Sequence, residues 1–218
     1  MHQQVDETEP HVEPEVEPRV EHDTERHPVL AWWLLIGGAI GLLAAGTLLV
    51  EKIRVLSDPS YVPSCSLNPV LSCGSVMNSE QAEVLGFPNP IIGVAAFAVV
   101  AATGAGMLAG ARLARWYWWG LQAGVVAGMG FVVWLFVQSL YEIGALCPYC
   151  MVVWVVVLVT FWYVTLRNVE QGLFGERFAG HPAVRTILVW HSVGVLVVVL
   201  VAVALIGERF WYYWQTLV

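Results

Sequence analysis

Long apolar runs alternate with short polar segments along most of the chain. Five runs hold almost all of the apolar residues, and each is about 20–25 residues long, which is enough for a helix to cross the hydrocarbon core of a bilayer. The pattern therefore predicts an all-α integral membrane protein with five transmembrane helices. The runs are residues 30–50, 91–111, 116–140, 147–166 and 183–206.

Composition supports a membrane protein and explains the net charge. The chain has 218 residues, of which 58% are hydrophobic and 12% are charged, about half the charged fraction of a soluble domain. The net charge of −7 arises in residues 1–28, which are rich in Glu, Pro and His and lack an apolar face. We expect this segment to be a disordered acidic tail. The rest of the chain has balanced charge and no basic patch, so a nucleic-acid partner is not expected.

The distribution of basic residues predicts the orientation. Lys and Arg number seven on the side that holds the N-terminus and three on the other side, where Lys52 and Arg54 lie. Because loops rich in Lys and Arg stay in the cytoplasm, the N-terminus is predicted to be cytoplasmic and the C-terminus to lie outside.

The four cysteines all fall on the predicted outer side. Cys147-Pro-Tyr-Cys150 opens the fourth run, and Cys65 and Cys73 lie in the loop 51–90. Pro148 suits the first turn of a helix, so both thiols of Cys147 and Cys150 lie at a helix N-terminus, where the helix dipole favours the thiolate. The eight-residue separation of Cys65 and Cys73 is easily bridged, and we expect a reversible disulfide there.

Three interpretations of the cysteines are open at this point. They can be structural cysteines of a membrane scaffold or transporter, or ligands of a zinc ion, although the Cys65–Cys73 spacing is wider than structural zinc sites use. They can also form a dithiol relay that passes two electrons to a quinone in the membrane. The loop 51–90 is expected to cap the outer end of the bundle, with a short helix over residues 75–85.

Several motifs in this order resemble the vitamin K epoxide reductase family. They are the Cys65-x7-Cys73 loop pair, Ser79 six residues later, Gly86-Phe-Pro-Asn-Pro-Ile-Ile-Gly93 before the second run, and Leu-Tyr-Glu before Cys147-x-x-Cys150. The resemblance covers residues 28–166, and it places the catalytic bundle at residues 29–166. Residues 167–218 are then a cytoplasmic loop, a fifth helix and a short outer tail.

The resemblance implies four helices packed around a quinone, beneath an extracytoplasmic cap. It assigns Cys150 as the thiol nearest the quinone, Cys147 as the thiol that exchanges with Cys73, and Cys65 as the cysteine that meets a partner protein. The resemblance implies that Asn89 and Ser79 bind the quinone as hydrogen-bond donors, and Trp154 is a further candidate because its ring can stack on the quinone.

The chain differs from its relatives in two respects that bear on function. Trp154 stands where the mammalian enzymes have a tyrosine, which favours reduction of a plain quinone, menaquinone or ubiquinone, over reduction of an epoxide. Many bacterial relatives carry a fused thioredoxin-like domain after the fifth span, and we expect a separate extracytoplasmic DsbA-like oxidoreductase to be the partner here. The implied location is the bacterial cytoplasmic membrane.

Overall fold

The structure is a computed structural model that describes residues 28–58, 60–175 and 190–215. The predicted acidic tail, apart from Pro28, and the first part of the predicted fifth run lie outside these residues. The long helices are α2 (Pro28–Ser57), α4 (Pro90–Leu108), α5 (Arg115–Gln138), α6 (Pro148–Glu170) and α9 (His191–Arg209); the short elements are α3 (Cys73–Met77), the 3-10 helix η1 (Glu80–Glu83), the π-helix η2 (Ser139–Ile143) and α10 (Trp211–Trp214).

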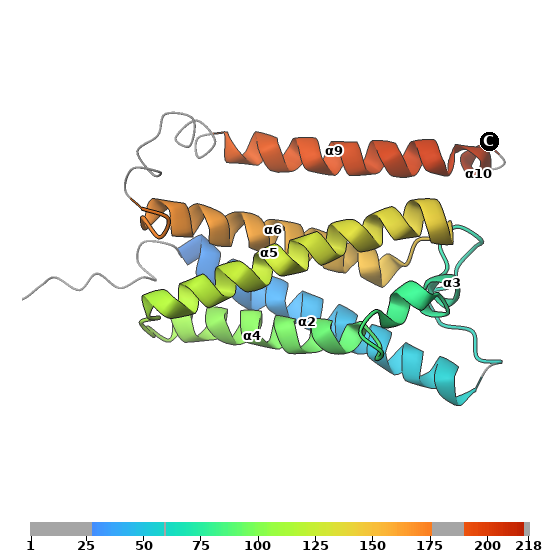
Figure 1. The fold of residues 1–218 in the computed structure, drawn as a ribbon, viewed down its shortest axis with the longest axis horizontal. Coiled ribbons are helices and arrows are strands. Elements are labelled where there is room, and N and C mark those ends of the chain that lie inside the picture. Colours follow the sequence, from blue (N-terminus) through green and yellow to red (C-terminus); the bar gives the residue numbers. More distant parts are fainter. Residues whose placement is uncertain (1–27, 59, 176–189, 216–218) are drawn as a thin grey trace, which may run out of the picture.

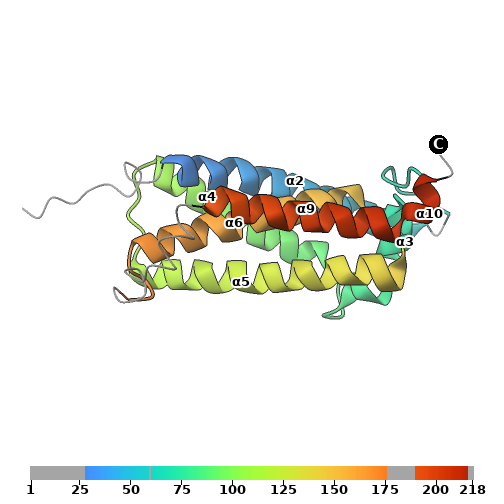
Figure 2. The same cartoon turned by 90° about the horizontal axis from the view of Figure 1, so that it is seen from above.

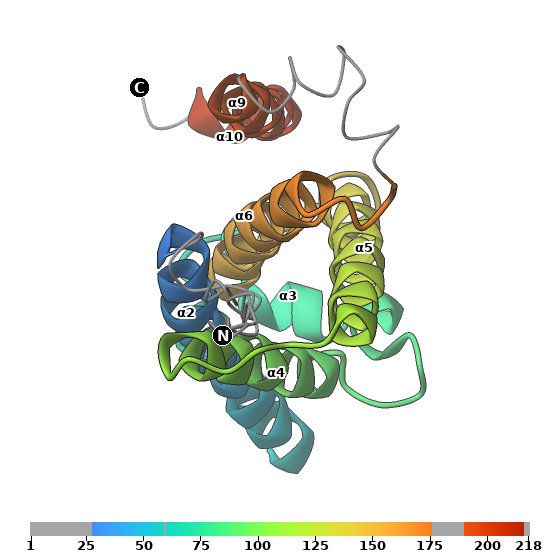
Figure 3. The same cartoon turned by 90° about the vertical axis from the view of Figure 1, so that its left-hand side faces the viewer.

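Within the part of the chain that the structure describes, five helices are long and apolar enough to cross a membrane, which confirms the predicted all-α membrane architecture. Seen along the bundle, α2, α4, α5 and α6 form a ring, α3 lies across one end of it, and α9 lies outside the ring on the side of α6 (Figure 3). The start of α2 lies at the end of the bundle opposite α3, whereas α10 lies at the same end as α3 (Figures 1 and 2).

Small residues bring α2 and α4 together. A Cβ atom added at Gly38 would lie 2.6 Å from the backbone nitrogen of Ala101, and one added at Gly104 would lie 2.8 Å from the carbonyl oxygen of Ala31. Both positions therefore require glycine, because a side chain would push the two backbones apart. This pair of helices forms one wall of the bundle.

The first helix is longer than the apolar run predicted. The loop was expected to begin at residue 51, but α2 continues to Ser57. The last two turns carry Glu51 and Lys52, which are buried at 4% and 6% exposure. Charged residues can extend the helix here because the segment that follows supplies hydrogen-bond partners for them. We call residues 60–89, which connect α2 to α4, the cap.

The cap contains two short helices where a single helix over residues 75–85 was expected. The hydroxyl of Ser72 accepts a hydrogen bond from the Ser75 backbone and caps α3, which therefore begins at Cys73 instead of residue 75. Asn78 and Ser79 then separate α3 from η1. The early start of α3 matters for function because it places Cys73 at the first position of the helix.

Candidate active site

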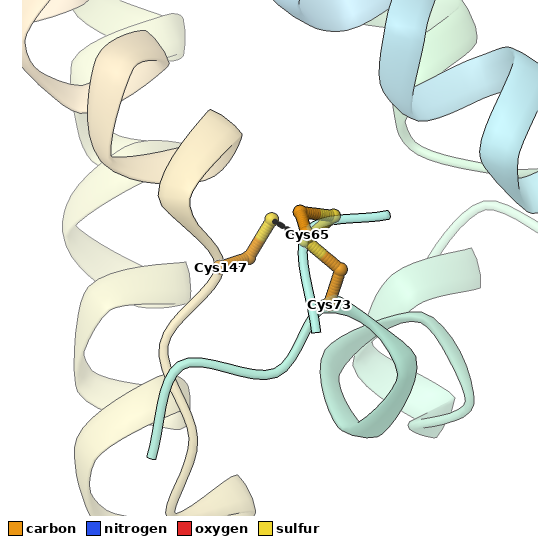
Figure 4. Close-up of side chains that lie close together, drawn as sticks. All are labelled: Cys65, Cys73 and Cys147. Carbon is orange, nitrogen blue, oxygen red and sulfur yellow. Dashed lines mark hydrogen bonds between the residues drawn. A yellow bond between two sulfur atoms is a disulfide. The ribbon is translucent and has the colours of Figure 1, made fainter. Parts of the chain in front are cut away.

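Three of the four cysteines meet where the cap lies against the start of α6. Cys65 and Cys73 form a disulfide with a Cα–Cα distance of 5.5 Å, and the Cys147 sulfur lies 3.1 Å from the Cys73 sulfur (Figure 4). Cys65, Cys73 and Cys147 are at most 6% exposed. Cys147 and Cys150 are free thiols, and Cys150 is half-buried. The predicted Cys65–Cys73 pairing is therefore present as a disulfide.

A short backbone pairing brings Cys73 and Cys147 together across 74 residues of sequence. Leu71 and Leu146 form an isolated parallel β-bridge. The Leu146 N–H donates to the Val70 carbonyl at 2.7 Å, and the Ser72 N–H donates to the Leu146 carbonyl at 2.9 Å. Because each cysteine directly follows a residue of this pairing, the position of the two sulfur atoms depends on it.

The end of α2 holds the cap on both sides of the disulfide. The Glu51 carboxylate accepts hydrogen bonds from the hydroxyls of Tyr61 and Ser64, both at 2.9 Å, next to Cys65. Lys52 donates to the Met77 carbonyl at 2.7 Å, at the end of the helix that Cys73 begins. Sequence reasoning placed these two charged residues in the loop, and the available signal was a charged pair directly after an apolar run.

The surroundings of Cys147 favour its thiolate. The neighbouring Cys150 thiol, acting as a hydrogen-bond donor, is the main cause that lowers the pKa of Cys147. The backbone N–H groups of Cys150 and Tyr149 at the start of α6 lower this pKa further, although burial opposes them. This agrees with the helix-terminus argument made from the sequence.

This geometry permits thiol–disulfide exchange. A Cys147 thiolate 3.1 Å from a disulfide sulfur can attack it, forming a Cys73–Cys147 bond and releasing Cys65 as a thiolate; the reverse reaction restores the first disulfide. The sulfur atoms of Cys65, Cys73 and Cys147 lie within 4.8 Å of one another, as in a metal site. Two of them are bonded together, however, and a metal requires free thiolates.

A cavity of about 500 Å³ lies within the four-helix bundle, below the cap. Its volume is in the range of small-molecule sites. Cys147 and Cys150 contribute to its lining, together with apolar residues of α2, α4, α5 and α6. The lining includes Val99 of α4 and Gly120 of α5. Val99 is 52% exposed and Gly120 is also exposed, so the cavity reaches the lateral surface of the bundle between these two helices.

The three residues predicted to bind the quinone all line this cavity. Ser79 donates its hydroxyl to the Val76 carbonyl at 2.8 Å. Asn89 donates to the Gln81 carbonyl at 2.7 Å and accepts from the Val84 N–H at 3.2 Å. These two side chains therefore also hold the cap in shape.

Trp154 packs edge-on against Phe136, with ring centroids 5.1 Å apart. Two further polar residues of the lining, Lys52 and Gln81, were missed at the sequence level. Gln81 donates to the Gln138 side chain at 3.3 Å, which links η1 to α5. No local sequence pattern indicates either contact, because both join segments that are distant in sequence.

A membrane helix bundle that places a disulfide, a buried thiol and a half-buried thiol beside an apolar cavity is a membrane thiol oxidoreductase. The family model of the vitamin K epoxide reductase family matches residues 32–165, and the chain belongs to that family. The resemblance inferred from the motifs is thereby confirmed. A search of the curated proteins finds no match to this chain.

Proposed function

We propose that the protein drives disulfide formation outside the cytoplasm by passing electrons from a partner protein to a membrane quinone. The observation that supports this most directly is the 3.1 Å contact between the Cys73 and Cys147 sulfur atoms. It joins a disulfide in the cap to a thiol pair that lines the cavity. We place the N-terminus in the cytoplasm of a bacterial cell and the cap outside, in accordance with the basic-residue distribution.

The first step occurs in the cap. A thiolate of a DsbA-like, thioredoxin-fold partner attacks the Cys65–Cys73 disulfide at Cys65, and a second partner thiol resolves the mixed disulfide. The partner leaves oxidised, and Cys65 and Cys73 become thiols. Because Cys65 is 6% exposed, the residues around it must move to admit the partner.

The second step transfers the electrons to the rim of the cavity. The Cys73 thiolate attacks the Cys147 sulfur of a Cys147–Cys150 disulfide, and Cys65 then attacks Cys73. This restores the cap disulfide and leaves Cys147 and Cys150 as thiols. The state in the structure, with Cys65–Cys73 oxidised and the other pair reduced, corresponds to the one that this proposed step leaves.

The third step uses the cavity. A quinone accepts two electrons and two protons when it is reduced, and the Cys147–Cys150 disulfide forms again. The volume of the cavity and its apolar lining fit a quinone ring. Its opening between α4 and α5 fits a lipid-soluble substrate that arrives from the bilayer. We assign Cys150 as the thiol that contacts the quinone, with Ser79, Asn89 and Trp154 lining the ring site.

The test is quinone-dependent loss of free thiols in the purified protein. After reduction, thiol labelling with and without added menaquinone or ubiquinone measures how many cysteines become oxidised. We expect a quinone-dependent loss of free thiols, because the relay donates electrons to the quinone. A scaffold or transporter with structural cysteines shows the same labelling in both samples, and that result would reject the proposal.

The roles of the two rim cysteines are tested by trapping. Cys150→Ala removes the thiol that competes for Cys147, so a Cys73–Cys147 disulfide should accumulate. Cys147→Ala should leave Cys150 unlinked to the cap. Non-reducing peptide mapping of both variants distinguishes them, and a Cys150–cap link in the second variant as abundant as the link in the first contradicts the assignment.

A further inference from the structure

The fifth helix packs on the bundle at the cap end through its last residues. Phe210, directly after α9, is fully buried in a cluster with Val70, Leu140 and Leu146. Farther back along α9, Leu196 and Leu200 are 55% and 57% exposed. Figure 2 shows α10, which follows Phe210, at the same end of the bundle as α3. The end of α9 is thus a specific contact, whereas much of its length faces outward.

A second contact comes from the neighbouring residue. The Arg209 side chain donates a hydrogen bond through Nε to the Leu140 carbonyl at 2.8 Å. Leu140 belongs to η2, which ends at Ile143 and is capped by Gly144, a residue in the left-handed conformation with φ 66°. This turn sends the chain into Ala145 and Leu146. Arg209 therefore holds the segment that leads to Cys147.

The two contacts converge on the backbone pairing that sets the sulfur–sulfur distance. Val70 and Leu146, which pack around Phe210, are the residues joined by the 2.7 Å hydrogen bond. Cys147 follows Leu146 directly, and Cys73 comes three residues after Val70. Removing the Phe210 ring would leave this pairing without support on one side, because a large void in a packed cluster allows its walls to shift.

We propose that the end of the fifth helix is a positioning element for the exchange between the two cysteine pairs, with Phe210 and Arg209 as its positioning residues. This inference rests on the proposed function, because it assigns the fifth helix to one step of that relay. We assign neither residue a contact with a sulfur atom. Both act through the backbone pairing between residues 70–72 and Leu146. A shift of about 1 Å at a reacting pair can slow a reaction roughly 100-fold.

The experiment measures the exchange and the quinone step separately. The exchange rate is the rate at which the Cys73–Cys147 disulfide forms in a Cys150→Ala background, which requires no quinone. The quinone step is the rate of Cys147–Cys150 disulfide formation on addition of menaquinone to a reduced protein that carries Cys65→Ala and Cys73→Ala. Each measurement is made with and without Phe210→Ala.

We expect Phe210→Ala to slow the exchange by roughly tenfold or more, while the quinone step stays within about twofold of its reference. Phe210→Leu should restore most of the exchange rate, since it refills the cluster. The matched control is Leu200→Ala, on the exposed face of the same helix, which should change neither rate. Arg209→Met and Arg209→Lys provide a second test if Phe210→Ala does not fold. Arg209→Met should slow the exchange, and Arg209→Lys should retain most of the exchange rate.

An unchanged exchange rate in Phe210→Ala, or in Arg209→Met if the first variant does not fold, overturns the inference. Equal slowing of the exchange and the quinone step also overturns it, because that result indicates a general loss of structure. If the reference protein shows no quinone step, the proposed function fails. The exchange measurement still tests the positioning role in that case, so the two failures are distinguishable.

Discussion

Lys52 offers a direct test of how the cap is held closed. Its side chain is 7% exposed, donates to the Met77 carbonyl at 2.7 Å and pairs with Glu83 at 2.9 Å. Lys52→Met keeps an apolar stem of similar length and removes the ammonium group. The Met77 carbonyl then loses its charged donor, and η1 loses its tie to α2. We expect the cap to open more often while the bundle stays folded.

The size of the effect follows from the two contacts. A buried hydrogen bond to a charged group is worth about 1.5–3 kcal/mol. The Glu83 side chain is 39% exposed, so the ion pair is screened by solvent and adds about 0.5 kcal/mol at most. A loss of about 2 kcal/mol in the free energy of opening the cap raises the open fraction roughly 30-fold.

Native-state hydrogen exchange of the α3 amides measures this opening. Glu83→Gln removes only the exposed ion pair and should raise exchange about twofold. Arg54→Gln, at the same end of α2, removes a hydrogen bond to the Tyr61 hydroxyl on the Cys65 side of the cap and should leave hydrogen exchange in α3 unchanged. An α3 exchange rate in Lys52→Met equal to that of the unmodified protein would contradict this role of Lys52, as would an effect of the same size in Glu83→Gln.

Three further outcomes are expected. In a protein without Cys65 and Cys73, alkylation of Cys147 should stay fast at pH values below the ordinary pKa of a cysteine thiol, and should slow as the pH falls through the lowered pKa of Cys147. Cys150→Ala removes the main cause of the lowered pKa and should move the pH midpoint of alkylation upward; an unchanged midpoint would contradict this prediction. Gly104→Ala should destabilise the protein strongly, because the added Cβ atom would meet the α2 backbone. Gly120→Ala adds a Cβ atom that meets no atom within 4 Å, so it should be neutral or stabilise the protein by about 0.5–1 kcal/mol. Thermal unfolding of both variants in detergent measures the difference. A reporter fused to the C-terminus should be active outside the cytoplasm, and cytoplasmic activity would reverse the proposed orientation.

The sequence by itself determined the features that depend on local pattern. Apolar runs of bilayer length predicted the five helices, and the start of an apolar run beside Pro148 placed Cys147 and Cys150 at a helix N-terminus. The cysteine spacing and the motifs around it identified the family. These features could be read because helix length, helix capping and residue order are all encoded within short stretches.

The tertiary structure alone decided the features that depend on long-range contacts. It extended α2 beyond the apolar run, since Glu51 and Lys52 find their partners in the cap, and it joined Gln81 of η1 to Gln138 of α5. It also brought Phe210 against Val70 and Leu146, which a sequence pattern does not indicate. Each of these contacts joins residues that the sequence separates, and their energies depend on burial, which exists only once the chain has folded.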